Sequence, residues 1–264
     1  MTPDFSIITV AFNSEKTIER TIKSVLNQTY KNYEYIIIDG GSTDKTNEII
    51  SKYKKEFSGG ITHISEPDKG IYDAMNKGIA LTRGKVIGLL NSDDYYFDNT
   101  LAIVHDAYIN SDKNAVLTGN MIFKSDIGEQ LLKNSEKRLK RKFKYFKNGV
   151  RHPATFLPKV IYDKVGLFNV AYKIAADAEL MLRIFKAKYV FKFIDRPLLI
   201  MADGGISNSK GIVRQTVLEK SYILKSYCPN AFLRFLLMAE TRLRFKVKEL
   251  ASGLTTIYRK IENH

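Results

Sequence analysis

The chain has a single cysteine and no long apolar segment, and each shortage excludes a class of protein. Cys228 is the only cysteine among 264 residues, so an internal disulfide framework is excluded and a reducing cytosol is expected. No window approaches the roughly 18 unbroken apolar residues of a membrane span. No basic stretch followed by an apolar segment opens the chain, so we expect no secretory signal. Internal repeats and low-complexity linkers are also missing.

Two common phosphate-binding loops are absent as well. The sequence contains neither G-x-G-x-x-G nor a Walker A lysine loop. A phosphorylated ligand would therefore be met by a metal ion rather than by a glycine-rich cradle.

Acidic residues are scarce in the C-terminal part of the chain, which has a formal charge of +14 overall. Residues 1–100 carry 12 Lys and Arg against 14 Asp and Glu, whereas residues 101–209 carry 19 against 10 and residues 210–264 carry 11 against 4. A basic surface there could attract nucleic acid, anionic lipid or a phosphorylated acceptor. The densest basic run, 133–147, is typical of a solvated face or mobile loop, and contact with a phosphate-bearing acceptor is the alternative.

Strand and helix patterns alternate through the first hundred residues. Short apolar runs predict strands at 6–11, 35–38, 61–65 and 86–90, with helical spacing between them. This alternation predicts an α/β fold with a parallel sheet and right-handed crossovers. Farther along we expect strands between 115 and 132, a helix at 179–188, strands at 189–194 and 197–200, and a helical tail over 215–261 that breaks near residues 228–229.

Polar and acidic residues follow each of the first four predicted strands, where ligands of an open α/β sheet tend to bind. They are Asn13 and Ser14, then Asp39, Ser42 and Asp44, then Glu66, Asp68 and Lys69, and finally Asp93 and Asp94. Asp39 could accept hydrogen bonds from a pyrimidine N–H or a ribose hydroxyl. Adjacent carboxylates raise each other's pKa unless a cation neutralises them. Asp93 and Asp94 therefore predict a divalent cation that holds a phosphorylated substrate, and the alternative is that they only cap a turn.

Several ordered motifs resemble those of the family 2 glycosyltransferases over roughly residues 5–210. Residues 6–13 and 37–44 resemble the opening of that family. Further motifs resemble a branch of the family that makes bacterial surface polysaccharides, such as O-antigen, capsule or exopolysaccharide. These motifs lie at residues 66–79, 90–94, 151–156, 166–168 and 176–183.

The resemblance implies a GT-A fold, a Rossmann-like and mostly parallel sheet flanked by helices. It also implies an inverting, metal-dependent hexosyltransferase that uses a UDP-sugar and Mn²⁺ or Mg²⁺. The implied acceptor is a lipid-linked saccharide on a polyprenyl diphosphate, with no nucleic acid as partner. The chain has no Q-x-x-R-W segment and no membrane span, so a single-sugar transferase is favoured over a processive polymer synthase.

Site residues follow from the same resemblance. The donor would be held by Asp39, Asp68 and Asp93, with Thr9, Ala11, Asn13, Lys69 and Asn76 in the same motifs. Asp94, together with Asp93, would ligate the metal, although Asn91 and Ser92 stand where the commoner family motif has an aspartate. Asp177 matches the general base, or alternatively caps a helix starting near residue 178. His152, Glu179 and Arg183 are accessory or acceptor-side candidates.

We expect a GT-A domain over 1–210, with a nucleotide-sugar half at 1–100 and an acceptor half at 101–210. A helical, basic extension at 211–264 follows, and packing on the core, on a partner subunit or on the membrane is left open. The expected location is cytoplasmic, peripheral at the inner face of the cell membrane. Two rival hypotheses are a sugar-nucleotide pyrophosphorylase, whose glycine-rich loop is missing from residues 10–16, and a non-catalytic protein binding nucleic acid through residues 133–147.

Overall fold

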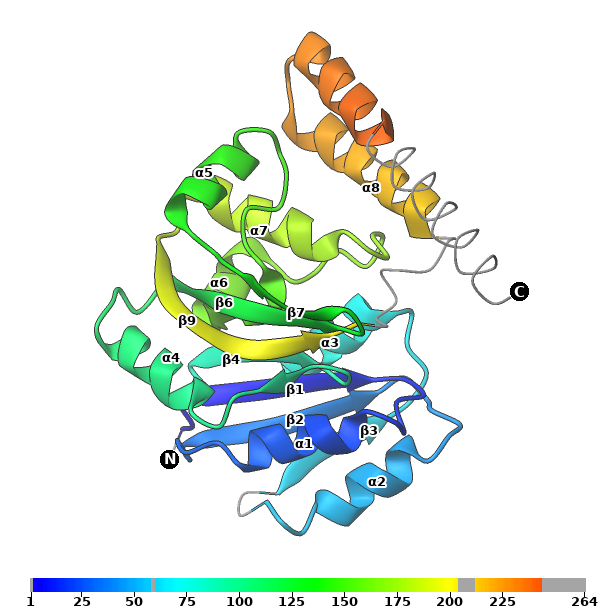
Figure 1. Cartoon of the computed structure of the whole chain (residues 1–264), viewed down its shortest axis with the longest axis vertical. Coiled ribbons are helices and arrows are strands. Elements are labelled where there is room, and N and C mark those ends of the chain that lie inside the picture. Colours follow the sequence, from blue (N-terminus) through cyan, green and yellow to red (C-terminus); the bar gives the residue numbers. More distant parts are fainter. Residues whose placement is uncertain (1, 58–59, 204–211, 244–264) are drawn as a thin grey trace. The chain divides into compact units, whose positions relative to one another are not determined.

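The structure is a computed structural model that describes residues 2–57, 60–203 and 212–243. The chain divides into two compact units, Met1–Gly205 and Ile206–His264. The first unit has the predicted α/β architecture, with helices flanking one mixed sheet (Figure 1).

The nine strands described in the first unit form one sheet in the order β3-β2-β1-β4-β8-β6-β9-β5, with β7 paired to β6. Their bounds are β1 Phe5–Ala11, β2 Tyr33–Asp39, β3 Ile61–Ser65, β4 Val86–Asn91, β5 Tyr95–Tyr96, β6 Val116–Ser125, β7 Gly128–Leu132, β8 Thr155–Pro158 and β9 Phe191–Ala202.

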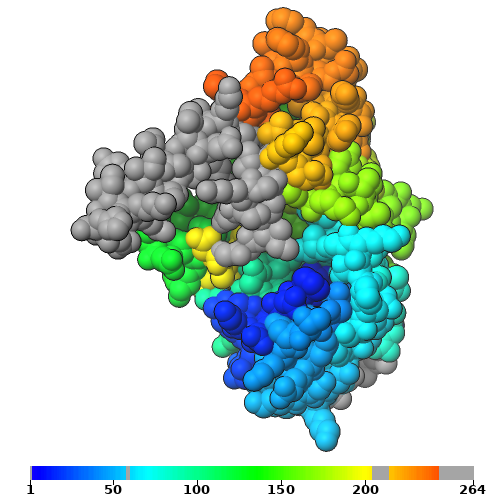
Figure 2. All heavy atoms as spheres, turned by 90° about the vertical axis from the view of Figure 1, so that its right-hand side faces the viewer, coloured from blue at the N-terminus to red at the C-terminus, as the bar shows by residue number. Residues whose placement is uncertain are grey.

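The first four strands are parallel to one another, as the alternation predicts. All seven residues of β1 are buried, because helices cover both faces of this half of the sheet. The helices that connect these strands are α1 Ile18–Leu26, α2 Thr46–Tyr53 and α3 Ile71–Ala80. In the space-filling view the first hundred residues, blue to cyan, form a contiguous body (Figure 2).

The second half of the sheet departs from simple parallel order. β8 runs antiparallel to β4 and to β6, while β6 and β9 are parallel. The region where strands are expected, 115–132, contains β6 and β7, and the pairing of β6 with β9 shifts register around Asn120. The strands expected at 189–194 and 197–200 are the single strand β9. Remaining helices are α4 Thr100–Ile109, α5 Glu136–Phe143, η1 His152–Ala154, α6 Lys159–Val165 and α7 Ala176–Lys186.

The basic run contains a helix rather than a loop. Ser135 caps α5 by accepting a hydrogen bond from the Arg138 N–H, and Leu139 and Phe143 are buried one turn apart. The Phe143 ring lies 4.6 Å from the Phe185 ring of α7, so the two helices pack together. Most charged residues of α5 form a solvated face, one of the alternatives expected for this run, whereas Arg138 and Lys142 are partly buried.

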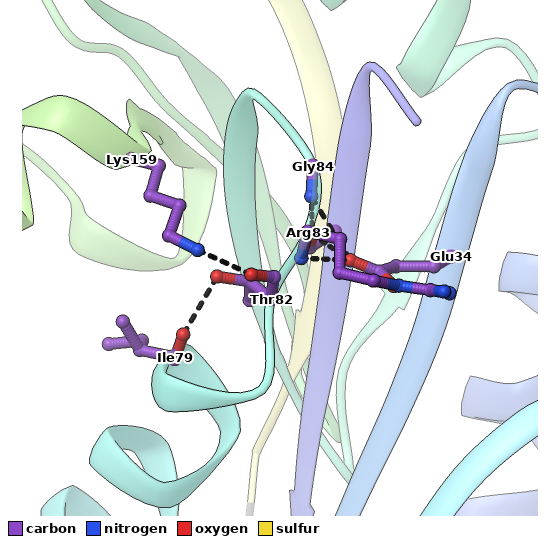
Figure 3. A network of polar contacts seen from close by, with 7 residues as sticks. Glu34, Ile79, Thr82, Arg83, Gly84 and Lys159 are labelled. Carbon is purple, nitrogen blue, oxygen red and sulfur yellow. Dashed lines mark hydrogen bonds and ion pairs between the residues drawn. The ribbon is translucent and has the colours of Figure 1, made fainter. Parts of the chain in front are cut away.

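A carboxylate joins the strands at the opposite edge from the acidic clusters. Glu34, near the start of β2, accepts hydrogen bonds from Ser6 Oγ at 2.6 Å, from the Arg83 N–H at 2.5 Å and from the Gly84 N–H at 3.1 Å. The Arg83 Nε also donates to it at 2.8 Å (Figure 3). Burial alone would raise the pKa of Glu34, but these hydrogen bonds together hold it below its ordinary value.

The second unit is helical where it is described. Helix α8 spans Ile212–Tyr227, and residues 231–243 form another helix after Cys228 and Pro229. The break therefore lies where the sequence predicts it, because proline lacks the N–H that would continue the helix. Residues 204–211, and the part of the expected helical tail beyond 243, lie outside the described residues.

Candidate functional site

The site is built from loops that leave the carboxyl ends of β1, β2 and β4. Ala11 pairs with Asp39, and Val10 pairs with Asn91, so the three loops begin side by side. The hydroxyl oxygens of Ser14 and Ser92 lie 2.7 Å apart and join the first loop to the third. The predicted convergence of strand ends at one edge is therefore present.

Asn13 ties the first loop to the second. Its backbone is in the left-handed region, with φ of 49°, where asparagine is several-fold enriched among non-glycine residues. Its N–H donates to Ser42 Oγ at 2.8 Å, and its Oδ1 accepts from the Thr43 N–H at 2.9 Å. Asn13 thus fixes the β1 loop against the β2 loop.

Asp39 is fully buried and saturated by donors of its own chain. It accepts hydrogen bonds from the Ser42 N–H at 2.9 Å, from Ser42 Oγ, from Asn47 Nδ2 at 2.9 Å and from Ser65 Oγ at 2.6 Å. Burial favours protonation, but these donors hold the pKa of Asp39 below its ordinary value, so it stays a carboxylate. Beside it, Asn47 Oδ1 is a buried acceptor with no hydrogen-bond partner, a feature that the sequence pattern did not reveal.

Asp68 lies over Gly40. One oxygen of Asp68 accepts a hydrogen bond from the Gly70 N–H at 2.7 Å. The other lies 2.5 Å from the position that a Cβ on Gly40 would take, so only glycine leaves room for this carboxylate. Phe12 reaches the same point at 3.4 Å and is 63% exposed. An exposed aromatic ring beside a carboxylate at this edge was not predicted.

Two predicted donor-binding residues, Thr9 and Asn76, have their polar side-chain groups engaged within the protein. Thr9 is fully buried and accepts a hydrogen bond from the Tyr35 hydroxyl at 3.0 Å. The Asn76 amide bonds both backbone groups of Phe168, at 2.9 and 3.0 Å. Lys69 has an exposed side chain, and its N–H donates to Asp73 at 3.0 Å. Their assignment to the donor stays a prediction, as does that of Ala11, which is buried.

Asp93 and Asp94 differ in exposure. Asp94 is only 1% exposed and accepts two long hydrogen bonds, from Asn91 Nδ2 and from the Ala202 N–H, each at 3.3 Å. Burial, followed by the negative charge of Asp93, raises the pKa of Asp94 to about 8. Burial also raises the pKa of the partly exposed Asp93. The sequence did predict that two adjacent carboxylates at this point disfavour each other's charge.

Helix α1 supports this pair from behind. The Thr21 hydroxyl contacts the main-chain oxygens of Ser92 at 2.9 Å and of Asp94 at 2.7 Å. Arg20 Nη2 donates to the main-chain oxygen of Asp93 at 2.8 Å, and its guanidinium lies 4.3 Å from the Tyr95 ring centroid. Neither residue stood out in the sequence, because both have ordinary positions in an amphipathic helix.

The donor set suits a hard divalent cation. Neither Asp93 nor Asp94 forms an ion pair with a cationic side chain in the described part of the chain, because Arg20 binds a main-chain oxygen instead. No group of three or more His, Cys, Asp or Glu among the described residues is arranged to hold a metal. Mg²⁺ commonly binds through one or two carboxylates plus substrate phosphates, so a third protein ligand is not required.

Asp177 lies in the first turn of α7, one residue inside the helix, whose N-cap is Ala175. It therefore does not cap the helix. Its Oδ1 lies 3.4 Å from the Tyr72 hydroxyl, and its Oδ2 lies 3.3 Å from Asn148 Nδ2. Lys173 Nζ, just upstream, donates to the Lys69 main-chain oxygen at 2.6 Å and ties this segment to the loop that carries Asp68.

The three accessory candidates have distinct surroundings. His152 is buried, and burial lowers its pKa, while the charge of the nearby Asp177 opposes that shift. Glu179 is buried and ion-paired with Arg183 at 2.9 Å. Arg183 also donates to the main-chain oxygens of Val165 and Leu167. Arg183 thus holds α7 to the preceding segment, and Glu179 pairs with that arginine.

Known proteins match much of this chain. The model of Glycosyl transferase family 2 matches residues 6–164. The PGL/p-HBAD biosynthesis glycosyltransferase Rv2957 of Mycobacterium tuberculosis is 28% identical over 188 residues, which cover 69% of this chain and 70% of that protein.

Solved structures show the same fold. S. aureus TarS 1–349 in complex with UDP-GlcNAc has a TM-score of 0.67 at 18% identity, over 90% of this chain and 71% of that one. The chain spans 42% of a longer TarS chain. Mannosyltransferase PcManGT from Pyrobaculum calidifontis, in complex with GDP-Man and Mn²⁺, has a TM-score of 0.65 at 13% identity, over 97% of this chain and 81% of that one.

Proposed function

Because the chain belongs to family 2 of the glycosyltransferases and has the GT-A fold, we propose that it is an inverting, metal-dependent enzyme. It moves one sugar from a UDP-sugar to a lipid-linked saccharide during bacterial surface polysaccharide synthesis. The observation that carries the proposal is the meeting of the β1, β2 and β4 loops at one edge of the sheet. The β4 loop carries Asp93 and Asp94, two carboxylates without a cationic partner among the described residues. Family membership leaves the pyrophosphorylase and nucleic-acid hypotheses without support.

The donor's nucleoside fits the edge formed by the β2 loop and Asp68. The fixed carboxylate of Asp39 orders Ser42 and Ser65, and the unpartnered Asn47 Oδ1 can accept a hydrogen bond from a base or ribose. Phe12 offers an exposed aromatic face on which a base can stack. A uracil nucleotide is supported by TarS, which was crystallised with UDP-GlcNAc.

Asp93 would hold Mn²⁺ or Mg²⁺ directly, and the buried Asp94 would position it. When bound, the ion neutralises charge that develops on the departing diphosphate. PcManGT, which was crystallised with Mn²⁺, supports this assignment. The protein holds these two aspartates in place. Thr21 and Arg20 fix the main chain of Asp93 and Asp94, and Ser14 joins the β1 loop to Ser92.

Asp177 would act as the general base. Its carboxylate takes the proton from an acceptor hydroxyl as the oxygen attacks the anomeric carbon from the face opposite the nucleotide. A single displacement inverts that centre and needs no enzyme nucleophile. The Tyr72 hydroxyl and Asn148 Nδ2 lie 3.4 and 3.3 Å from the two oxygens of Asp177, so each oxygen has a polar neighbour.

The acceptor side would face the inner surface of the cell membrane. In the described part of the chain no helix is long and apolar enough to cross a bilayer. Exposed apolar residues on the helix at 231–243 lie among basic ones, and such a surface suits an anionic bilayer plane. The exposed residues are Phe232, Phe235, Leu236 and Leu243, and the basic residues among them are Arg234 and Arg242.

The proposal is tested by incubating the purified protein with a panel of nucleotide sugars, Mn²⁺ and a lipid extract that contains the acceptor. Release of UDP that EDTA abolishes is expected, together with a product whose anomeric configuration, read by NMR, is opposite to that of the donor. Retained configuration, or release that is equally fast in EDTA, would contradict it.

A further inference from the structure

Two arginine side chains near the start of β8 have a buried Nε without a partner among the described residues. Arg138 is in α5 and Arg151 directly precedes η1, and each is partly buried. The Nε atom of each is buried without a hydrogen-bond partner, and neither side chain forms an ion pair within the described chain. Buried donors are nearly always satisfied in native structures, so these two guanidinium groups indicate a missing acceptor.

The main chains of the two arginines are bonded to two consecutive residues, Asn134 and Ser135. The Arg151 N–H donates to Asn134 Oδ1 at 2.9 Å, while Asn134 Nδ2 bonds β6 through the Gly119 main-chain oxygen at 2.7 Å. The next residue, Ser135, accepts from the Arg138 N–H at 3.2 Å. The two guanidinium groups therefore extend from one rigid junction rather than from a loose loop.

The charges of this junction repel each other. Burial, followed by the charge of Arg141, lowers the pKa of Arg138. Burial, followed by the charge of Arg138, lowers the pKa of Arg151. Other basic residues nearby have carboxylate partners, such as Lys140 with Glu136 at 2.6 Å. An external anion would relieve the repulsion and satisfy both Nε donors at once.

The junction adjoins the candidate base. Asn148 donates to Asp177 at 3.3 Å and lies three residues before Arg151. His152, the residue after Arg151, is close enough to Asp177 to feel its charge. The Phe143 ring of α5 packs on α7, the helix that carries Asp177. An anion at the arginines would therefore lie on the acceptor side of the reaction.

We propose that Arg138 and Arg151 bind a phosphate group of the acceptor, so that the acceptor is a saccharide carried on a diphosphate. The inference rests on the proposed function and specifies its acceptor. Two planar guanidinium groups can each bind phosphate oxygens through paired N–H donors, which a lysine cannot imitate. The bound phosphate would hold the saccharide with its hydroxyl toward Asp177.

Direct binding is measured by calorimetric titration with inorganic pyrophosphate in EDTA, which removes the metal needed at the donor site. Compared with wild type, Arg138→Gln and Arg151→Gln should each weaken binding about tenfold or more. Arg138→Lys keeps the charge but loses the fork, so an intermediate loss is expected. Lys137→Gln is the matched control, an equal charge change on the exposed neighbouring position of α5, and should change affinity less than twofold. Equal losses in Lys137→Gln and the arginine variants would overturn the proposal.

A kinetic arm separates this inference from the function itself. With a diphosphate-linked lipid saccharide, Arg138→Gln should raise the acceptor KM about tenfold, whereas with the octyl glycoside of the same saccharide it should not. If Arg138→Gln changes the KM of both acceptors by the same factor while sugar is still transferred, the phosphate site is overturned and the function stands. If pyrophosphate binding depends on the arginines but no sugar is transferred to either acceptor, the proposed function is overturned and the phosphate site stands. If the arginine variants instead lose binding to phosphatidylglycerol vesicles and keep pyrophosphate affinity, the site belongs to a lipid surface and the proposal is wrong.

Discussion

The hydroxyl of Tyr72 lies 3.4 Å from Oδ1 of Asp177 and donates a hydrogen bond to the Ile174 main-chain oxygen at 2.8 Å. Tyr72 is in α3, which follows the Asp68 loop, whereas Asp177 opens α7. One side chain thus connects the donor half of the domain to the proposed base. The Tyr72 ring also stacks on Phe168, with ring centroids 5.3 Å apart, so its position is fixed by packing.

Tyr72→Phe keeps this stacking and removes only the hydroxyl. We expect kcat to fall by up to about tenfold with little change in donor KM, since the lost hydroxyl holds the main chain at Ile174, just before α7, and lies beside Asp177. Steady-state kinetics at varied donor concentration measures both values. A rise in donor KM with an unchanged kcat would show that Tyr72 serves the donor instead.

Gly40→Ala tests the position of Asp68. The added methyl would lie 2.5 Å from an Asp68 oxygen, and the carboxylate must move away. Weaker UDP binding, by about tenfold, is expected from calorimetry. The double variant Gly40→Ala with Asp68→Asn should bind no more weakly than Asp68→Asn alone, because both changes act on the same contact. Additive losses would contradict this explanation.

Asp93→Asn tests the metal site. Mn²⁺ affinity in the presence of UDP, followed by electron paramagnetic resonance, should fall by more than the roughly 10- to 100-fold typical of changes outside the ligand shell. Asp98→Asn is the control, because Asp98 is an exposed aspartate close by in the sequence. Equal Mn²⁺ affinities in the two variants would rule out Asp93 as a ligand.

Glu34→Gln tests the hydrogen bonds that close the other edge of the sheet. The free energy of unfolding at pH 7, from urea titration, should fall by about 1–3 kcal/mol. The pKa of Glu34 in the folded protein lies below its ordinary value of 4.5, so its stabilising effect is complete above that pH and is lost as pH falls through the lower folded value. The difference between wild type and variant should therefore shrink in acid. The exposed Glu56→Gln should show neither effect, and a constant difference across this pH range would contradict the assignment.

Much of the sheet and its acidic edge was predictable because local patterns encode them. The apolar runs of β1, β2 and β4 are buried on both faces, and each ends where polar residues begin. Parallel order then brings Ser14 beside Ser92, although they are 78 residues apart in sequence. The pattern for the second half of the sheet was weaker, because β8 is only four residues long.

The motifs could not predict which polar side chains form hydrogen bonds within the protein itself. Asp39 and Asp44 look alike in the sequence, yet Asp39 is surrounded by four donors that the fold collects from three segments. Thr9 and Asn76 lie in the family motifs, but packing engages their polar groups. Arg138 was one of many basic residues in its run, and only the packing of α5 distinguishes it from exposed neighbours.

The central claim is that Asp177, and not its neighbour Glu179, removes the proton of the acceptor. The most direct measurement is kcat for sugar transfer by Asp177→Asn and Glu179→Gln, each with its thermal stability. Asp177→Asn should lower kcat by about 10²–10⁴ and leave the melting temperature nearly unchanged. Glu179→Gln should lower the melting temperature, since it breaks the buried pair with Arg183, and retain most of kcat in the folded fraction. Full activity in Asp177→Asn would contradict the account.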